Sequence, residues 1–355
     1  MRLALLAALL LVSCVPPSSA SVAATQSATP SVAPARTAQS SAEPTAAQKP
    51  PGPMLITIKE YAVGRGQGPH DVAPAKDGGI WYTAQRTGEL GWLDPASGNT
   101  RMVKLGSGSA PHGVIVGPDG APWITDGGLN AIVRVDPVTN DVKRYPLPAG
   151  RPNANLNTAT FDRAGTLWFT GQNGIYGSLD TRTGAMVVYD APRGAGPYGI
   201  ATTPSGDVYY ASLAGSYLGR IDLASGMTTV LEPPTRGQGA RRVWPDSRGR
   251  LWITEWNAGK IASFDPASNA WREYAIELAG GGAQPYAVFV GDGDVVWVTD
   301  FAQNAILDFD IASGSFHSNP LPSAGAAVRQ LLGRTGEIWG AESGTDKLVV
   351  VRLGP

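Results

Sequence analysis

A tryptophan that returns about every 42 residues is the feature that most limits the folds open to this chain. The series begins at Trp81 and continues, once as a tyrosine, through Trp123, Trp168, Tyr209, Trp252, Trp297 and Trp339. The spacings are 42, 45, 41, 43, 45 and 42 residues. A period of this length, with several short strands in each unit, is typical of the blades of a β-propeller.

Residues 111–148 show the strand pattern of one repeat unit. Four β-branched and aromatic runs lie at residues 113–116, 122–125, 131–135 and 142–145, and a tight turn, Gly117-Pro118-Asp119-Gly120, separates the first two. A four-stranded sheet with two apolar faces cannot bury itself alone. We therefore expect an all-β fold, a seven-bladed β-propeller of four-stranded antiparallel blades over residues 54–355. The seven tryptophan positions are expected to pack one blade on the next.

The two ends of this region predict how the ring closes. Residues 55–63 resemble the fourth strand of a blade, whereas the chain ends after a third strand at residues 347–353. The N-terminal strand is thus expected to complete the last blade, because an open ring would expose a sheet edge. The predicted outer strands are 56–63, 100–105, 142–147, 186–191, 227–231, 271–276 and 315–321.

The N-terminal segment predicts export. Residues 1–13 carry Arg2 and then an apolar run that fits a signal peptide. Leu11-Val12-Ser13-Cys14 resembles the bacterial lipoprotein cleavage box, so Cys14, the only cysteine, is the predicted lipidation site. The alternative is an ordinary signal peptide that is cleaved after Ala20. Residues 14–53, rich in Ala, Ser, Pro and Thr, are expected to be a disordered tether to a membrane of the bacterial cell envelope, on its periplasmic or extracellular side.

The composition limits the kinds of partner that we expect this protein to bind. A net charge of −1 argues against nucleic-acid binding. We expect a monomer that takes a small-molecule or peptide ligand at the mouth of the central channel, where propeller loops gather.

The repeat predicts which side chains lie at that mouth. One set lies eleven residues before each tryptophan position, where the first strand begins: His70, His112, Asn157, Tyr198, Arg241, Tyr286 and Val328. A second set lies three residues after it, where the second strand ends: Ala84, Asp126, Gly171, Ser212, Glu255, Asp300 and Glu342. Because a hairpin joins the two strands, both sets are expected at the same rim.

These residue types predict a metal-assisted site. Converging carboxylates attract a hard cation, so Mg²⁺ or Ca²⁺ is the predicted cofactor, with Glu342, Asp300, Glu255 and Asp126 as ligands. His112 or His70 is the predicted base. The predicted substrate contacts are Tyr198, Tyr286, Arg241, Trp256 and Asn157. Alternatively, the carboxylates cap loops or pair with arginine and bind no metal.

Several motifs resemble the virginiamycin B lyase (streptogramin lyase) family. They are Pro111-His112-Gly113-Val114, Trp123-Ile124-Thr125-Asp126, Tyr145-Pro146-Leu147-Pro148, Pro197-Tyr198-Gly199-Ile200 and Leu251-Trp252-Ile253-Thr254-Glu255-Trp256. The resemblance implies a seven-bladed propeller and a Mg²⁺-dependent elimination that opens the ester ring of a cyclic depsipeptide. It also implies a histidine where this chain has Tyr286, and a Glu-Pro-His motif where it has Ala326-Ala327-Val328; Glu342 fits a third family position.

Three functional hypotheses follow. The first is an exported, metal-dependent lyase, in which His70 and His112 take the place of the family's histidines in neighbouring blades. The second is a non-catalytic ligand- or protein-binding propeller of the cell envelope, since fold alone does not fix function. The third is a metal-dependent lactonase, which would add water across the ester.

Overall fold

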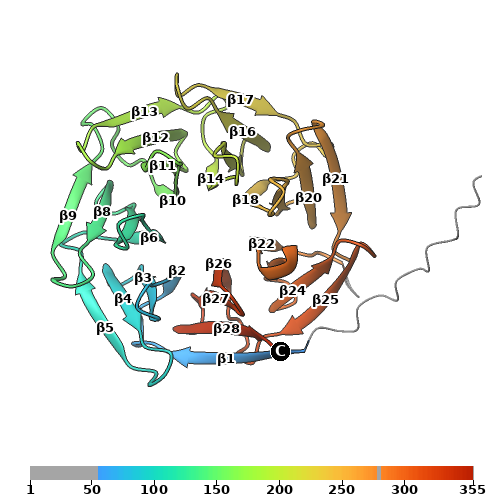
Figure 1. Cartoon of the computed structure of the whole chain (residues 1–355), viewed down its shortest axis with the longest axis horizontal. Coiled ribbons are helices and arrows are strands. Elements are labelled where there is room, and N and C mark those ends of the chain that lie inside the picture. The colour runs from blue at the N-terminus through green and yellow to red at the C-terminus, as the bar shows by residue number, and fades with distance from the viewer. Residues whose placement is uncertain (1–54, 278–280, 355) are drawn as a thin grey trace, which may run out of the picture. The chain divides into compact units, whose positions relative to one another are not determined.

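The structure, a computed structural model, describes residues 55–277 and 281–354. The predicted signal peptide, Cys14 and the tether lie outside the described residues. The described residues form a ring of seven four-stranded antiparallel sheets around a central axis (Figure 1). This confirms the all-β, seven-bladed propeller.

The first four blades follow one another along the chain. Blade 1 holds β2 (Pro69–Pro74), β3 (Ile80–Ala84), β4 (Glu89–Leu93) and β5 (Thr100–Lys104). Blade 2 holds β6 (Pro111–Val116), β7 (Pro122–Asp126), β8 (Ala131–Val135) and β9 (Val142–Pro146). Blade 3 holds β10 (Leu156–Phe161), β11 (Thr166–Gly171), β12 (Ile175–Asp180) and β13 (Met186–Asp190). Blade 4 holds β14 (Pro197–Thr202), β15 (Val208–Ser212), β16 (Tyr217–Ile221) and β17 (Thr228–Leu231).

The remaining blades complete the ring. Blade 5 holds β18 (Ala240–Pro245), β19 (Leu251–Glu255), β20 (Lys260–Asp265) and β21 (Ala270–Ala275). Blade 6 holds β22 (Pro285–Val290), the short 3₁₀ helix η1 (Asp292–Asp294), β23 (Val296–Asp300), β24 (Ala305–Asp310) and β25 (Ser315–Pro320). Blade 7 holds β26 (Val328–Arg334), β27 (Glu337–Glu342), β28 (Lys347–Leu353) and, as its outer strand, β1 (Ile56–Ala62).

Ring closure occurs as expected. The strand β1 pairs antiparallel with β28, from Ile56 opposite Leu353 to Ala62 opposite Lys347. Tyr61 of this strand is buried and stacks on Trp339, with ring centroids 5.5 Å apart. The outer strands begin and end within one residue of the predicted bounds.

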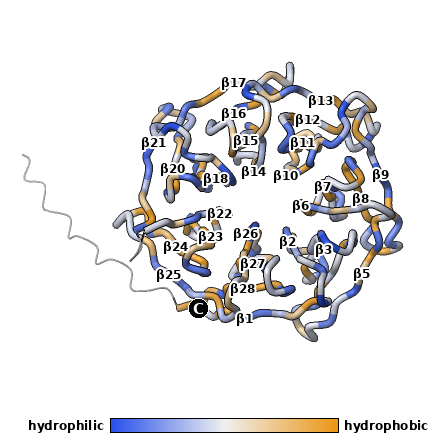
Figure 2. Tube along the Cα trace, turned by 180° about the vertical axis from the view of Figure 1, so that it is seen from behind, coloured by the Kyte–Doolittle hydropathy of each residue, from blue (hydrophilic) through white to orange (hydrophobic). Residues whose placement is uncertain are grey.

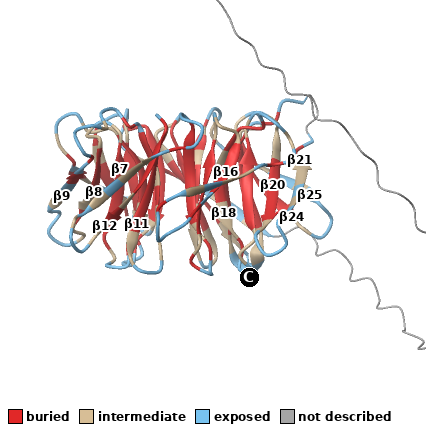
Figure 3. Cartoon of the chain, turned by 90° about the horizontal axis from the view of Figure 1, so that it is seen from above, coloured by how far each residue is buried: buried red, intermediate tan, exposed pale blue. Residues whose placement is uncertain are grey.

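The core lies between blades, as the tryptophan period predicts. Trp81 packs with Val114 and Ile124 of blade 2, and Trp252 packs with Val288 and Val298 of blade 6. Burial is densest along the inner strands, whereas the loops at both rims are exposed (Figure 3). In the part of the chain that the structure describes, no helix has the length and apolarity to cross a membrane.

Candidate functional site at the mouth of the axis

A β-bulge in each first strand turns side chains toward the axis. In blade 1, Pro69 pairs with Ala84 and Val72 with Tyr82, so β2 advances three residues while β3 advances two. His70 and Asp71 therefore lie outside the regular ladder. Bulges redirect side chains in this way and are common beside functional sites.

A threonine two residues after the tryptophan supports the bulge in five blades. In blade 1, Thr83 accepts a hydrogen bond from the Asp71 amide at 3.0 Å and donates to the His112 carbonyl of blade 2 at 2.8 Å. The other four are Thr125, Thr170, Thr254 and Thr299. Because the bulge leaves an amide outside the ladder, each threonine gives that donor a hydrogen-bond partner. Thr83, Thr125, Thr170 and Thr254 also donate to a backbone carbonyl of the next blade.

Two neighbouring blades bring their histidines together. The rings of His70 and His112 have centroids 3.8 Å apart, and both side chains are buried, at 3% and 6% exposure. The Nδ1 atom of His70 lies 2.8 Å from Oδ1 of Asp71, and Nδ2 of Asn157 donates to Nε2 of His112 at 3.2 Å. With its Nδ1 proton donated to Asp71, His70 keeps Nε2 as its basic nitrogen.

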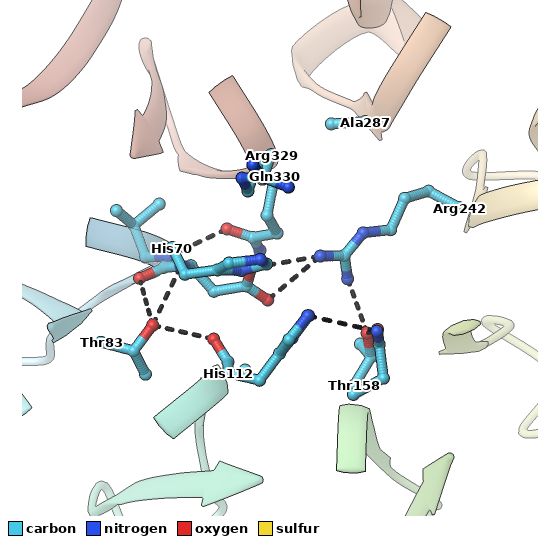
Figure 4. A network of polar contacts seen from close by, with 12 residues as sticks. His70, Thr83, His112, Thr158, Arg242, Ala287, Arg329 and Gln330 are labelled. Carbon is cyan, nitrogen blue, oxygen red and sulfur yellow. Dashed lines mark hydrogen bonds and ion pairs between the residues drawn. The ribbon is translucent and has the colours of Figure 1, made fainter. Parts of the chain in front are cut away.

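An ion pair crosses the axis directly beneath these rings. Arg242 of blade 5 reaches Asp71 of blade 1, with Nη2 at 3.1 Å from Oδ1, and donates from Nη1 to Thr158 of blade 3 at 2.6 Å (Figure 4). Gln330 of blade 7 accepts a hydrogen bond from the Val72 amide. The ion pair and these hydrogen bonds thus join blades 1, 3, 5 and 7, and His112 of blade 2 bonds to Asn157 and Thr83 beside them.

Burial and arginine charges keep both imidazoles neutral. The pKa of His70 is lowered well below its usual value, first by burial and then by Arg242, Arg329 and Arg241. Burial also lowers the pKa of His112, and the neighbouring His70 lowers it further. For Asp71, burial raises the pKa against the opposing effect of Arg242.

Aromatic and arginine side chains from blades 4 to 7 cover the network. The hydroxyls of Tyr198 and Tyr286 hydrogen-bond to each other across the axis. Arg241 stacks over the Tyr286 ring at 3.5 Å from its centroid and donates to the Tyr198 hydroxyl at 3.1 Å. Trp256 meets the Tyr286 ring edge-on at 5.6 Å. The inner ends of β18 and β26 are accordingly hydrophilic (Figure 2).

In blade 7 the predicted inner-ring position was wrong by one residue. Val328 was expected in the inner ring, but it pairs with Glu342, as Pro285 pairs with Asp300 in blade 6. The first hairpin of blade 7 is one residue shorter than the others, since Gly333 pairs with Ile338. The bulge therefore presents Arg329 to the mouth, where its Nη1 lies 3.4 Å from the Tyr286 hydroxyl.

The structure does not bring the four predicted carboxylate ligands together. Asp126 accepts hydrogen bonds from the amides of Ala110 and Leu129, and Asp300 accepts them from Gln284 and Gln303. Each aspartate thus caps turns of its own blade. Loop capping was the expected alternative to metal binding by these carboxylates.

The two glutamates occupy matching places in blades 5 and 7. Glu255 lies near Lys260 and Glu273, and Glu342 lies near Lys347 and Glu60. Lys260 binds Glu273 and Lys347 binds Glu60. Neither glutamate faces the axis. Burial raises the pKa of Glu255 to about 8 and that of Glu342 to about 7.

Within residues 55–277 and 281–354, one group of three side chains has the spacing of a candidate metal site. His70, Asp71 and His112 each offer a ligand atom, and these atoms lie within 4.8 Å of one another. Two of the three donors are the histidines that were predicted as bases; the third, Asp71, was not predicted, and none of the four predicted carboxylate ligands belongs to the group.

The sequence did not predict a role for Asp71, and Arg242 was expected only as a possible partner of Glu255, whereas it pairs with Asp71. They follow the predicted ring positions directly, where other blades carry Gly113, Gly199 or Ala287. A negative and a positive side chain at a position that is small or neutral in the other blades could have indicated that these two residues belong to the site.

The space beneath the mouth is too small for a substrate. A cavity of about 30 Å³, lined by Asp71, Gly113, Thr158 and Arg242 among others, has room for about one or two water molecules.

The fold and the site together define a seven-bladed propeller with a buried polar network at one mouth of its axis. A sequence profile described as the virginiamycin B lyase family matches residues 54–280, so the chain belongs to that family. No curated protein matches the chain.

Solved structures share the fold. A streptogramin B lyase is 23% identical with a TM-score of 0.77, over 84% of this chain and 98% of that one. The virginiamycin B lyase of Staphylococcus aureus is 22% identical with a TM-score of 0.78, over 84% and 100%. The extracellular domain of a putative hybrid two-component system of B. thetaiotaomicron is 14% identical with a TM-score of 0.67, over 83% of this chain and 42% of that one. At these identities the likeness concerns the fold alone.

Proposed function

We propose that this protein is a lyase that opens an ester or lactone by elimination at the mouth of its axis. The observation that carries the proposal is the His70–Asp71 pair beside His112, 3.8 Å away between ring centroids, in a chain that belongs to a lyase family. A neutral imidazole whose second nitrogen is held by a carboxylate is a competent general base.

The proposed reaction uses His70 as the base. Nε2 of His70 takes a proton from the carbon next to a carbonyl, a carbon–carbon double bond forms toward the neighbouring carbon, and the ester C–O bond at that neighbour breaks. The released carboxylate keeps the bonding electron pair, and no water is consumed. Arg241 and Arg329 stabilise the negative charge that develops on the carbonyl oxygen.

The donor set does not fit Mg²⁺ or Ca²⁺. Both ions take oxygen ligands, whereas two of the three donors of the candidate metal site are imidazole nitrogens. The third donor, Asp71, already pairs with Arg242, whose positive charge opposes a second cation. The proposed reaction therefore uses arginine charge in place of Mg²⁺ or Ca²⁺.

Product mass tests this proposal. The full chain would be incubated with a panel of cyclic depsipeptides, esters and lactones, and the products analysed by mass spectrometry. Elimination from a cyclic substrate gives a ring-opened product of unchanged mass, whereas a lactonase gives a product heavier by one water. His70→Ala should abolish turnover, while His317→Ala, in an outer strand, should retain it. A product heavier by one water, or full turnover by His70→Ala, would overturn the proposal.

A second candidate is a propeller that binds a ligand without transforming it. The near-complete burial of His70 and His112 favours this candidate, because a base must reach its substrate. Tight binding of a panel compound, unchanged by His70→Ala and without any product, would select it.

We also propose that the protein is exported and lipid-anchored through Cys14 as a monomer. The apolar run of residues 3–12 and the Leu11-Val12-Ser13-Cys14 motif support this proposal. Metabolic labelling with a fatty acid should mark the wild-type protein and leave Cys14→Ser unlabelled.

A further inference from the structure

We propose that the mouth of the axis binds a small organic anion, a carboxylate or phosphate monoester that carries a flat apolar group. This inference rests on the proposed function, since it names the substrate class of the same site. It is argued from charge, from unpaired donors and from the aromatic walls.

The first observation is an excess of positive charge. Arg241 and Arg329 both lie over the Tyr286 ring, and Arg241 and Arg242 both lie over the Tyr198 ring, so the three guanidinium groups gather at one place. Asp71 pairs with Arg242. Among the described residues, neither Arg241 nor Arg329 forms an ion pair with a carboxylate; their polar contacts are to hydroxyls, those of Tyr198, Tyr286 and Ser343. Two guanidinium groups are thus without a counter-charge at a half-buried mouth.

The second observation is that these two arginines retain unused donors in fixed positions. The Nε atom of Arg241 is buried and has no hydrogen-bond partner in the described part of the chain. Arg329 donates from Nε to Ser343 at 2.7 Å and from Nη1 to the Tyr286 hydroxyl at 3.4 Å, and no hydrogen bond from its Nη2 to a described residue is present. A guanidinium held in place matches the paired oxygens of carboxylate and phosphate groups.

The third observation is an aromatic wall beside the charges. The Tyr286 and Phe301 rings stack at 4.7 Å, and Trp256 meets Phe301 edge-on at 5.6 Å. Trp256 and Phe301 are only partly buried. Both arginines contact Tyr286, so an anion between them would bring its apolar group onto this wall.

Calorimetric titration of the full chain tests the inference with three probes: phenyl phosphate, inorganic phosphate and benzyl alcohol. We expect phenyl phosphate to bind most tightly, inorganic phosphate more weakly, and benzyl alcohol without measurable heat. Arg241→Gln and Arg329→Gln should each weaken phenyl phosphate binding by about tenfold or more, since each loses a charge-assisted contact.

Two controls keep the result interpretable. Arg163→Gln removes the same charge from an exposed hairpin turn of blade 3 and should leave the affinity unchanged. Arg329→Lys keeps the charge, loses the fork and should bind with intermediate affinity. Circular dichroism would verify that each variant is folded.

The outcomes separate this inference from the proposed reaction. Equal binding of phenyl phosphate and benzyl alcohol, no binding of either phosphate, or an equal loss in Arg163→Gln would overturn the anion site. His70→Ala should still bind phenyl phosphate. Anion binding without turnover of any ester would refute the elimination and leave the anion site standing.

Discussion

Glu255 should make the protein less stable as pH rises, and its replacement by glutamine should remove that loss. The side chain is fully buried, and neither carboxylate oxygen has a hydrogen-bond partner among the described residues. Burial, followed by the charge of Glu273, raises the pKa of Glu255 from 4.5 to about 8.

The sign follows from proton counting. Below pH 4.5 the folded and unfolded chains both hold the proton, so stability is complete. Between 4.5 and about 8 only the folded chain holds it, and the free energy of unfolding falls by about 1.4 kcal/mol per pH unit. Over roughly 3.5 units the loss is at most about 5 kcal/mol, and above pH 8 it grows no further.

Urea unfolding followed by circular dichroism measures this effect. At about pH 9 Glu255→Gln should be more stable than the wild type by up to about 5 kcal/mol, and near pH 5 the two should nearly coincide. Glu277→Gln, at an exposed position beyond β21, is the matched control and should follow the wild type. A stability difference that is constant with pH, or that grows toward acid, would refute the reasoning.

Three further predictions concern closure, the threonine contacts and the metal. Tyr61→Ala should lower the free energy of unfolding by about 3 kcal/mol in urea melts, because it removes the buried ring that stacks on Trp339; an effect below about 1 kcal/mol would mean that the closing strand contributes little. Thr125→Val should cost about 1–3 kcal/mol by leaving the Gly113 amide unpaired, whereas Thr57→Val, exposed on β1, should cost almost nothing; equal costs would contradict the bridging role. Millimolar Mg²⁺ or Ca²⁺ should leave the melting temperature where a monovalent salt of equal ionic strength leaves it, and a specific rise that is lost in Asp71→Asn would contradict our interpretation of the donor set.

The fold could be predicted from sequence because one large residue recurs at one structural position. Each tryptophan fills the gap between two blades, so its period counts the blades directly. Turn chemistry then set the strand ends, as at Gly120, which adopts a φ of +80° in the predicted turn.

Predicting the site was harder because the period gives a position along the chain and not a side-chain direction. Positions counted eleven residues back from the tryptophan identified the inner ring in six blades, and the shorter hairpin displaced the seventh from Val328 to Arg329. Asp126 and Asp300 lie on second strands, one strand away from the axis, and their carboxylates turn to nearby amides. The Asp71–Arg242 pair joins blades 1 and 5; the sequence shows the two opposite charges at matching positions but not that they meet across the axis.

A crystal structure of the full chain grown with phenyl phosphate tests the central claim most directly, namely that the mouth of the axis is where this protein binds its ligand. We predict density for the phosphate between Arg241 and Arg329, with the phenyl ring against Phe301 or Trp256. Density confined to the outer blade surfaces, with the mouth unchanged, would contradict the account.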